Sequence, residues 1–155
     1  MKPRTIKIIK RIVLGVLLTV ALFFIILFTC LYFHFNITIF DRPSDLSDKR
    51  ETIEVYHINW ACDCPDFIEG SYYEKNPAYE SREEDCIFIE PANSEVEIPE
   101  SYYNEGHFKK RLRLTGSFYL KEGIPASYQK KTPGEKPDKA KVFRYDKIEY
   151  IRKDK

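Results

Sequence analysis

One stretch near the start of the chain limits what the sequence can fold into. Residues 12–33 contain no charged side chain, and leucine, isoleucine, valine and phenylalanine dominate. A helix of this length rises roughly 30 Å, which matches the hydrocarbon core of a bilayer. A helix also satisfies its backbone hydrogen bonds within one segment, as a chain in lipid requires. We therefore predict a transmembrane helix at 12–33, with the lipid bilayer as its partner.

The charges on either side of this span predict its orientation. The preceding segment, 1–11, carries five basic residues and no acid, whereas the following segment, 34–51, mixes acids and bases. Segments rich in lysine and arginine next to a membrane span remain on the cytoplasmic side. We therefore predict a cytoplasmic tail at 1–11, a juxtamembrane linker at 34–51, and a domain outside the cytoplasm at 52–155. A cleaved signal peptide fits less well, since its apolar region is short and ends in small residues. The chain is therefore interpreted as a single-pass membrane protein with an uncleaved signal anchor.

Residues 52–155 are expected to form a mainly β domain. Segments 52–60 and 86–89 are rich in β-branched and aromatic residues, 111–120 alternates strictly between apolar and polar residues, and 142–151 supplies a last strand. No βαβ rhythm is present. Short strands without that rhythm favour a small antiparallel β-barrel or curled sheet, and an OB-like barrel is the leading architecture.

Segment 111–120 gives the clearest strand. A glycine on its inward face, Gly116, predicts a bulge that curls the sheet. We also expect an edge strand at 96–98, before Pro99, and one or two short helical turns, at 100–105 and 126–130. The alternation of segment 111–120 predicts these inward residues: Leu112, Leu114, Gly116, Phe118 and Leu120.

Charge is distributed unevenly along the β-rich domain. Residues 52–105 carry 14 acids and 2 bases, whereas 106–155 carry 15 bases and 6 acids. We predict that early and late strands are neighbours and pair these charges across the surface. The alternative is a basic stripe that binds an anionic ligand or glycan, with Lys109, Arg111 and Arg113 as candidates. Nucleic acid is a poor candidate partner for a domain outside the cytoplasm.

The most distinctive local motif is the sequence WACDCP at 60–65, with Cys86 further along the chain. In an oxidising compartment Cys62, Cys64 and Cys86 are disulfide candidates. A bond between Cys62 and Cys64 is expected to be strained, so Cys86 is the predicted partner of one of them. The alternative is a metal site formed by these cysteines with His57 or His107, although Cys-x-Cys lacks the two-residue turn of a zinc knuckle. A thiol-redox role is weaker, since Cys-x-x-Cys is missing.

The sequence shows no catalytic motif. It lacks a phosphate-binding glycine loop, a zinc-protease helix and a nucleophile elbow, so we predict no enzyme activity and no cofactor. The leading hypothesis is a non-catalytic interaction module, held by the anchor outside the cytoplasm and bound to a protein partner in a membrane assembly. Tyrosine-rich loops favour such contacts. The alternatives are an anionic-ligand-binding or glycan-binding barrel, and a metal-binding or thiol-redox domain at Cys62, Cys64 and Cys86.

Overall fold

The structure is a computed structural model that describes residues 3–104, 110–132, 134 and 136–152. Contacts along the chain divide it into two compact units, Met1–Asn36 and Ile37–Lys155. Each unit has its own architecture, and the two are described separately.

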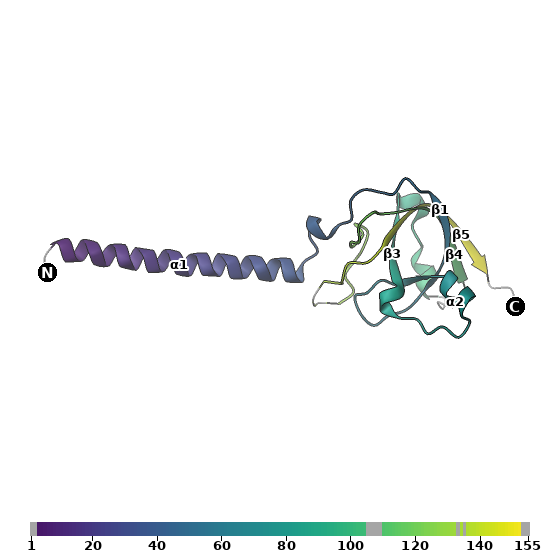
Figure 1. Ribbon diagram of the computed structural model, residues 1–155, viewed down its shortest axis with the longest axis horizontal. Coiled ribbons are helices and arrows are strands. Elements are labelled where there is room, and N and C mark those ends of the chain that lie inside the picture. The colour runs from purple at the N-terminus through teal and green to yellow at the C-terminus, as the bar shows by residue number, and fades with distance from the viewer. Residues whose placement is uncertain (1–2, 105–109, 133, 135, 153–155) are drawn as a thin grey trace. The chain divides into compact units, whose positions relative to one another are not determined.

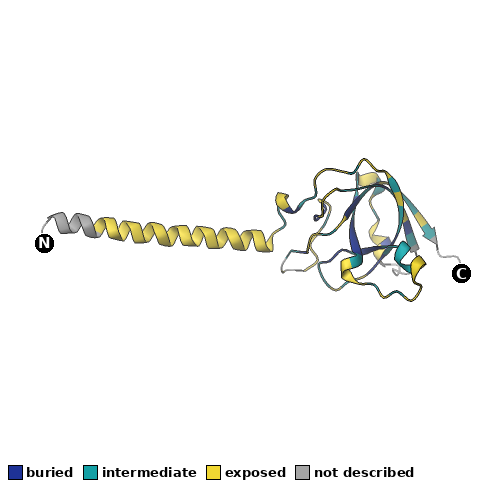
Figure 2. Ribbon diagram, viewed as in Figure 1, coloured by how far each residue is buried: buried dark blue, intermediate teal, exposed yellow. Residues whose placement is uncertain are grey.

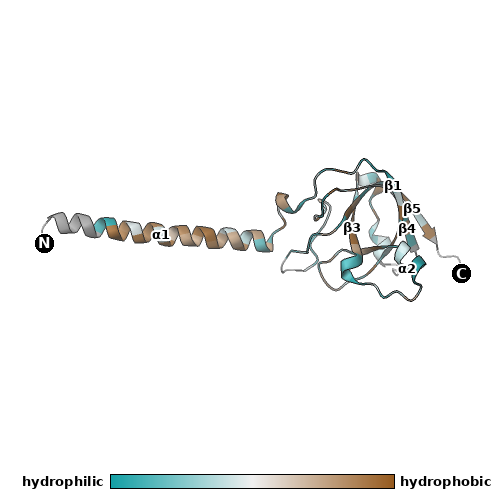
Figure 3. Ribbon diagram, in the orientation of Figure 1, coloured by the Kyte–Doolittle hydropathy of each residue, from teal (hydrophilic) through white to brown (hydrophobic). Residues whose placement is uncertain are grey.

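The first unit is one long helix, α1 (Pro3–Phe35), labelled in Figure 1. Proline is tolerated at the first position of a helix, because the N–H that it lacks would have no partner there. Residues Lys10–Phe35 are long and apolar enough to cross a membrane, and all of their side chains are exposed. Figure 3 shows the apolar character along this stretch. The predicted long apolar helix at the N-terminus is confirmed.

The second unit is a closed five-stranded barrel in which the strands follow the order β1-β2-β3-β5-β4. The mainly β barrel that the sequence predicts is confirmed, but it is not wholly antiparallel, because β3 and β5 run parallel. Parallel neighbours need a long connection, and the chain between β3 and β5 supplies one that includes β4. The strands are β1 (Glu51–His57), β2 (Phe67–Glu69), β3 (Cys86–Pro91), β4 (Lys110–Phe118) and β5 (Val142–Arg152).

One short helical segment precedes β1, and four more lie in the connections between the strands. The helical turn predicted at 100–105 is present as α3, whereas the edge strand predicted at 96–98 is wrong. The side chain of Asn93 accepts a hydrogen bond from the N–H of Glu95 and so caps a helical turn there instead. These segments are η1 (Ile39–Asp41), α2 (Ser71–Lys75), η2 (Glu83–Asp85), η3 (Ser94–Val96) and α3 (Glu100–Asn104).

The pairing of β4 with β5 is irregular at Gly116, where the sequence predicts a bulge. Thr115 pairs with Lys147 and Gly116 pairs with Tyr145, so the extra residue of the bulge, Asp146, belongs to β5. A Cβ atom at Gly116 would lie 2.0 Å from the backbone oxygen of Arg144, so only glycine fits. The inward placement of Leu120 is wrong, because β4 ends at Phe118 and Leu120 is exposed.

Apolar side chains from all five strands fill the barrel, and Figure 2 shows the buried residues on its strands. Burying one such side chain fully contributes about 1.5–3 kcal/mol. A second cluster, of Ile58, Ile68 and Cys86, is covered by partly buried tyrosines of the loops, so the fold itself uses some of the loop tyrosines. The main core contains Val55, Phe67, Ile87, Tyr102, Leu112, Leu114, Phe143 and Tyr145.

Opposite charges pair between early and late strands. Strand β1 lies beside β4, and Glu54 on β1 binds both Arg111, at 2.9 Å, and Arg113, at 2.8 Å. Before β1, Arg50 binds Asp146 of β5 at 2.5 Å. The charge pairing that the sequence predicts across the barrel surface is therefore confirmed.

Candidate functional site

The basic candidates for an anionic ligand already have carboxylate partners. Arg111 pairs with Glu54 and lies over the ring of Tyr56, 6.0 Å from its centroid. Arg113 lies between Glu54 and Glu149, at 2.8 Å and 3.4 Å. Lys109, the third candidate, lies outside the described residues. An anion at Arg111 and Arg113 would have to compete with Glu54 for both guanidinium groups.

The cysteine motif lies on residues 58–66, which join β1 to β2. Cys62 and Cys64 form a close pair, with their Cα atoms 5.3 Å apart, a separation that a disulfide can span. Cys86 is not the partner of either cysteine, contrary to our expectation, and its thiol is separate and buried. The indole N–H of Trp60 donates to the Cys86 sulfur at 3.5 Å, and burial raises the pKa of this thiol.

The structure does not assemble the predicted metal-ligand set. His57 lies in the barrel, 5% exposed, with its ring 5.2 Å from that of Phe67 and 5.0 Å from that of Tyr103. His107 lies outside the described residues. The group that does assemble among the described residues contains Cys62, Cys64 and Glu83, whose donor atoms lie within 4.8 Å of one another. Glu83 is about twenty positions further along the chain, and no spacing motif in the sequence points to it.

Asp63 lies between the two cysteines and links its loop by hydrogen bonds to the long loop between β4 and β5. Its carboxylate accepts hydrogen bonds from the Tyr128 hydroxyl at 2.7 Å and from the N–H groups of Lys131 and Thr132 at 2.6 Å and 3.0 Å. The Thr132 hydroxyl donates a further bond. Burial opposes ionisation, but the Thr132 hydroxyl and these other donors outweigh it and lower the pKa of Asp63 to about 2. Lys131 also pairs with Asp66 at 2.6 Å.

A cleft of about 670 Å³, which we call the aromatic cleft, opens where these two loops meet β3. Strand β2 is short and pairs with β3 only at Phe67 and Ile68, so β3 has no β2 partner from Phe88 onward. The lining comes from the β1–β2 and β4–β5 loops, from β3 and β5, and from the connection that contains α3. Its aromatic residues are His57, Phe67, Phe88, Tyr103, Tyr128 and Tyr145.

The charges in the aromatic cleft are mainly acidic. Asp66 and Glu97 line it, and Lys131, the one base among the described lining residues, is paired with Asp66. Burial and the nearby negative charge of Asp66 raise the pKa of Tyr103 to about 12, so its hydroxyl keeps its proton at neutral pH. Aromatic faces beside carboxylates suit neutral or basic groups better than anions.

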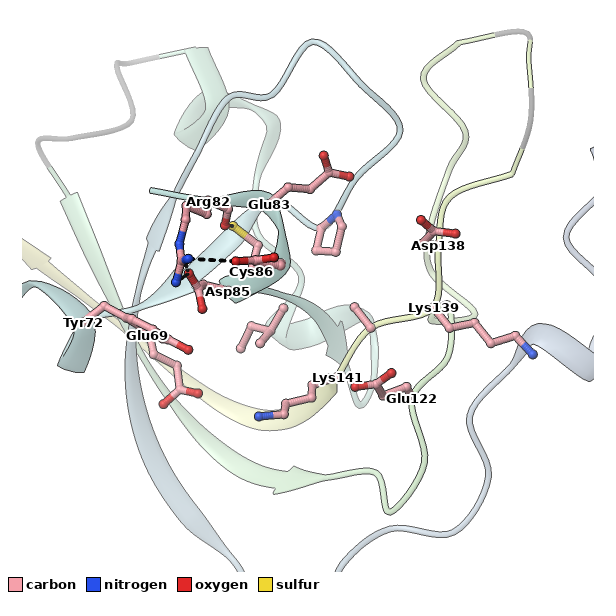
Figure 4. A pocket seen from close by; sticks show the side chains of 14 residues that line it. Glu69, Tyr72, Arg82, Glu83, Asp85, Cys86, Glu122, Asp138, Lys139 and Lys141 are labelled. Atoms are coloured by element: carbon pink, nitrogen blue, oxygen red, sulfur yellow. Dashed lines mark hydrogen bonds and ion pairs between the residues drawn. The ribbon is translucent and has the colours of Figure 1, made fainter. Parts of the chain in front are cut away.

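A second cavity, the charged groove, has a volume of about 650 Å³ and lies between the β2–β3 side of the barrel and the β4–β5 loop. Figure 4 shows Glu69, Glu83 and Asp85 with Arg82 on one side, and Glu122, Lys139 and Lys141 on the other. Arg82 binds Glu84 and Asp85, each at 2.9 Å. The groove is therefore lined by charged groups of both signs.

No protein-family model, no curated protein and no solved structure matches this chain.

Proposed function

We propose that this chain is a single-pass membrane protein whose barrel is a non-catalytic binding module outside the cytoplasm. The apolar side chains of α1 are exposed over Lys10–Phe35, and in water they would be in an unfavourable solvent. The five basic residues of segment 1–11 precede the apolar segment 12–33 without any acid among them, which favours an inside N-terminus and an outside barrel.

The connectivity supports an OB-like assignment for the barrel. The OB-fold is a five-stranded Greek-key barrel that binds ligands on the face of its second and third strands, between the loops that join strands 1 to 2 and 4 to 5. Here the order β1-β2-β3-β5-β4, the parallel β3–β5 pair and the closing β1–β4 pair fit such a barrel. Helix α3 lies between β3 and β4 in sequence.

The observation that carries the binding proposal is the aromatic cleft. It lies between the two loops that an OB-fold uses for recognition, and β3 forms one of its walls. Aromatic side chains dominate the centres of protein interfaces. The carboxylate of Glu97 adds a preference for basic groups, so the ligand proposed is a protein segment that inserts an apolar or basic side chain.

The anionic-ligand alternative finds less support. Its candidate arginines lie on β4 and share the carboxylate of Glu54. Neither Arg111 nor Arg113 lines the aromatic cleft or the charged groove. The cleft is therefore the better place to look for a partner.

Photo-crosslinking of the full chain in its native membrane tests this proposal. A photoreactive residue at Gln129, in the cleft, should give one defined adduct, and the same residue at Lys147, exposed on β5, should not. Replacing Ser127 with tryptophan fills the cleft and should abolish the adduct, whereas Ser44→Trp, exposed and outside the cleft, should leave it intact. Equal adducts from Gln129 and Lys147, or an adduct that survives Ser127→Trp, would refute binding in the cleft.

Protease added to intact cells tests the orientation. With the barrel outside, a tag placed after Lys155 should be removed without breaking the cells, and a tag before Met1 should be protected. The reverse pattern would contradict an inside N-terminus.

A further inference from the structure

We propose that Cys62 and Cys64, once their disulfide is reduced, bind one divalent cation of the zinc class together with Glu83. The three residues lie outside the aromatic cleft. This site is therefore independent of the partner-binding proposal, and either proposal can fail without the other.

The positions of the donor atoms suit a single ion. The two sulfurs and one carboxylate oxygen lie within 4.8 Å of one another. Two sulfurs on one tetrahedral zinc are separated by about 3.8 Å, because each zinc–sulfur bond is about 2.3 Å long. Breaking the disulfide lets the sulfurs move apart to that spacing, while the carboxylate needs only a small adjustment.

Of the three acidic residues in η2, Glu83 is the one that Arg82 does not pair with. Its neighbours Glu84 and Asp85 are both bound by Arg82, at 2.9 Å each. Within the part of the chain that the structure describes, the Glu83 carboxylate has no ion pair and no hydrogen bond. A carboxylate that is unpaired beside two cysteines can take up a cation without giving up another contact.

Both halves of the site are held by contacts outside it. On the cysteine side, Asp63 is fixed by the β4–β5 loop, and Pro65 restricts Cys64 to an extended backbone. On the other side, the carboxylate of Asp85 in η2 accepts a hydrogen bond from the Tyr79 hydroxyl and pairs with Arg82. These contacts hold the chain next to the three ligands, so the two segments that carry them stay close together.

The donor set favours zinc over other common cations. Two thiolates exclude magnesium and calcium, which prefer oxygen ligands, and the carboxylate suits a borderline divalent ion better than copper(I). Two thiolates and one carboxylate carry three negative charges. Three protein ligands leave one position for water, and Glu83 also lines the charged groove, shown in Figure 4, through which solvent reaches it.

The disulfide must be reduced before the metal can bind. A dithiol reductant transfers two electrons and two protons to the Cys62–Cys64 bond, so that two thiols form while the reductant becomes a disulfide. The cation then displaces the two thiol protons, which are released to water. Because the disulfide and the metal use the same sulfurs, the oxidised and metal-bound forms exclude each other.

Cobalt(II) is the spectroscopic probe for this site, because thiolate–cobalt bonds give ultraviolet charge-transfer absorption. The full chain, purified in detergent and reduced with a phosphine, should bind one Co²⁺ with this absorption, and Zn²⁺ should displace it. The oxidised chain should show no such absorption. The background carries Cys30→Ser and Cys86→Ala to remove the other thiols, and the unsubstituted chain is measured beside it so that a folding defect of the variant is recognised.

Matched variants identify the ligands. Cys62→Ser with Cys64→Ser should abolish binding, and Glu83→Gln should weaken it about tenfold or more, the loss typical of disturbing a metal site. Glu84→Gln, next in sequence and paired with Arg82, should bind like the parent. The proposal is overturned if the reduced chain gives no charge-transfer absorption, or if Glu83→Gln and Glu84→Gln bind equally well.

Discussion

The helix α1 and the barrel contain similar apolar side chains, but they place them in opposite environments. Leu18 and Phe23 of α1 are 63% and 61% exposed, whereas Leu112 and Leu114 of the barrel are fully buried. The barrel removes its apolar surface from water by folding on itself. Within its own unit the helix buries none of its apolar window, so its stability depends on a surrounding medium such as lipid.

Charges placed in the middle of α1 should have the largest effect, on the integration of the helix into the membrane, and they test this contrast directly. Leu22→Arg with Ile25→Arg should prevent stable integration, because an arginine at the centre of a membrane helix costs about 2.5–3.5 kcal/mol on insertion scales. Resistance of the membrane fraction to alkaline extraction measures the outcome. Leu22→Ala with Ile25→Ala is the control and should remain integrated. If the arginine variant also remains integrated, α1 is not held by lipid.

Adding one methyl group at Gly116 should have the next largest effect, on the stability of the barrel. Gly116→Ala forces a Cβ against the backbone of Arg144, and we expect the free energy of unfolding to fall by about 2–4 kcal/mol. Urea unfolding followed by the fluorescence of Trp60, the single tryptophan, measures it. Gly134→Ala and Gly15→Ala have nothing within 4 Å of the new atom and should leave barrel stability unchanged. Equal stability of all three variants would mean that the bulge tolerates a side chain.

Acid should loosen the contact between the two loops beside the cleft. Because the pKa of Asp63 falls from 3.8 to about 2 on folding, its stabilisation is complete above about pH 4 and is lost as the pH drops toward 2. We expect on the order of 1–2 kcal/mol after solvent screening. Unfolding measured over this range should show a smaller acid dependence in Asp63→Asn than in the parent.

Asp41 contributes to the acid dependence of the parent as well. Burial opposes its ionisation, but its bond to Lys136 and those to Thr38 lower its pKa. The difference between the parent and Asp63→Asn isolates the Asp63 contribution, because Asp41 is present in both. An identical acid dependence in the two proteins would show that the Asp63 contacts do not stabilise the fold.

The surface ion pair between Arg50 and Asp146 should have the smallest effect. Both side chains are largely exposed, so water and salt weaken their attraction. A double-mutant cycle with alanine at both positions should give a coupling smaller than any of the effects above, and the coupling should disappear at high salt. A large coupling that persists in salt would mean that this pair is part of the barrel's structural framework.

Local patterns in the sequence were enough to predict much of this molecule. The apolar run of α1, the alternation of β4 and the bulge at Gly116 depend on neighbouring residues, and all three are present. Strand β2 was missed, because its three residues are too few to show a period of two. The edge strand predicted before Pro99 did not form, and the residues before it, Ser94–Val96, make a helical turn that the Asn93 side chain caps.

The candidate sites were harder to predict, because they join distant residues. Asp63 and Thr132 are 69 positions apart, and only the closed barrel brings their loops together. Glu83 carries no motif that links it to Cys62 and Cys64. Cys86 has a suitable spacing for a disulfide, yet it packs beneath tyrosines in a separate cluster. Spacing along the chain identified the reactive residue types, but the three-dimensional contacts determined which of them meet.

The position of β5 in the barrel sets the order in which this unit can be built during translation. It is the last strand to leave the ribosome, and it pairs with β3 on one side and β4 on the other. Until it arrives, β3 has one unpaired edge, and such edges are sites of aggregation. Chains truncated before Val142 should therefore leave one edge of β3 and one edge of β4 unpaired and aggregate more readily than chains that include β5.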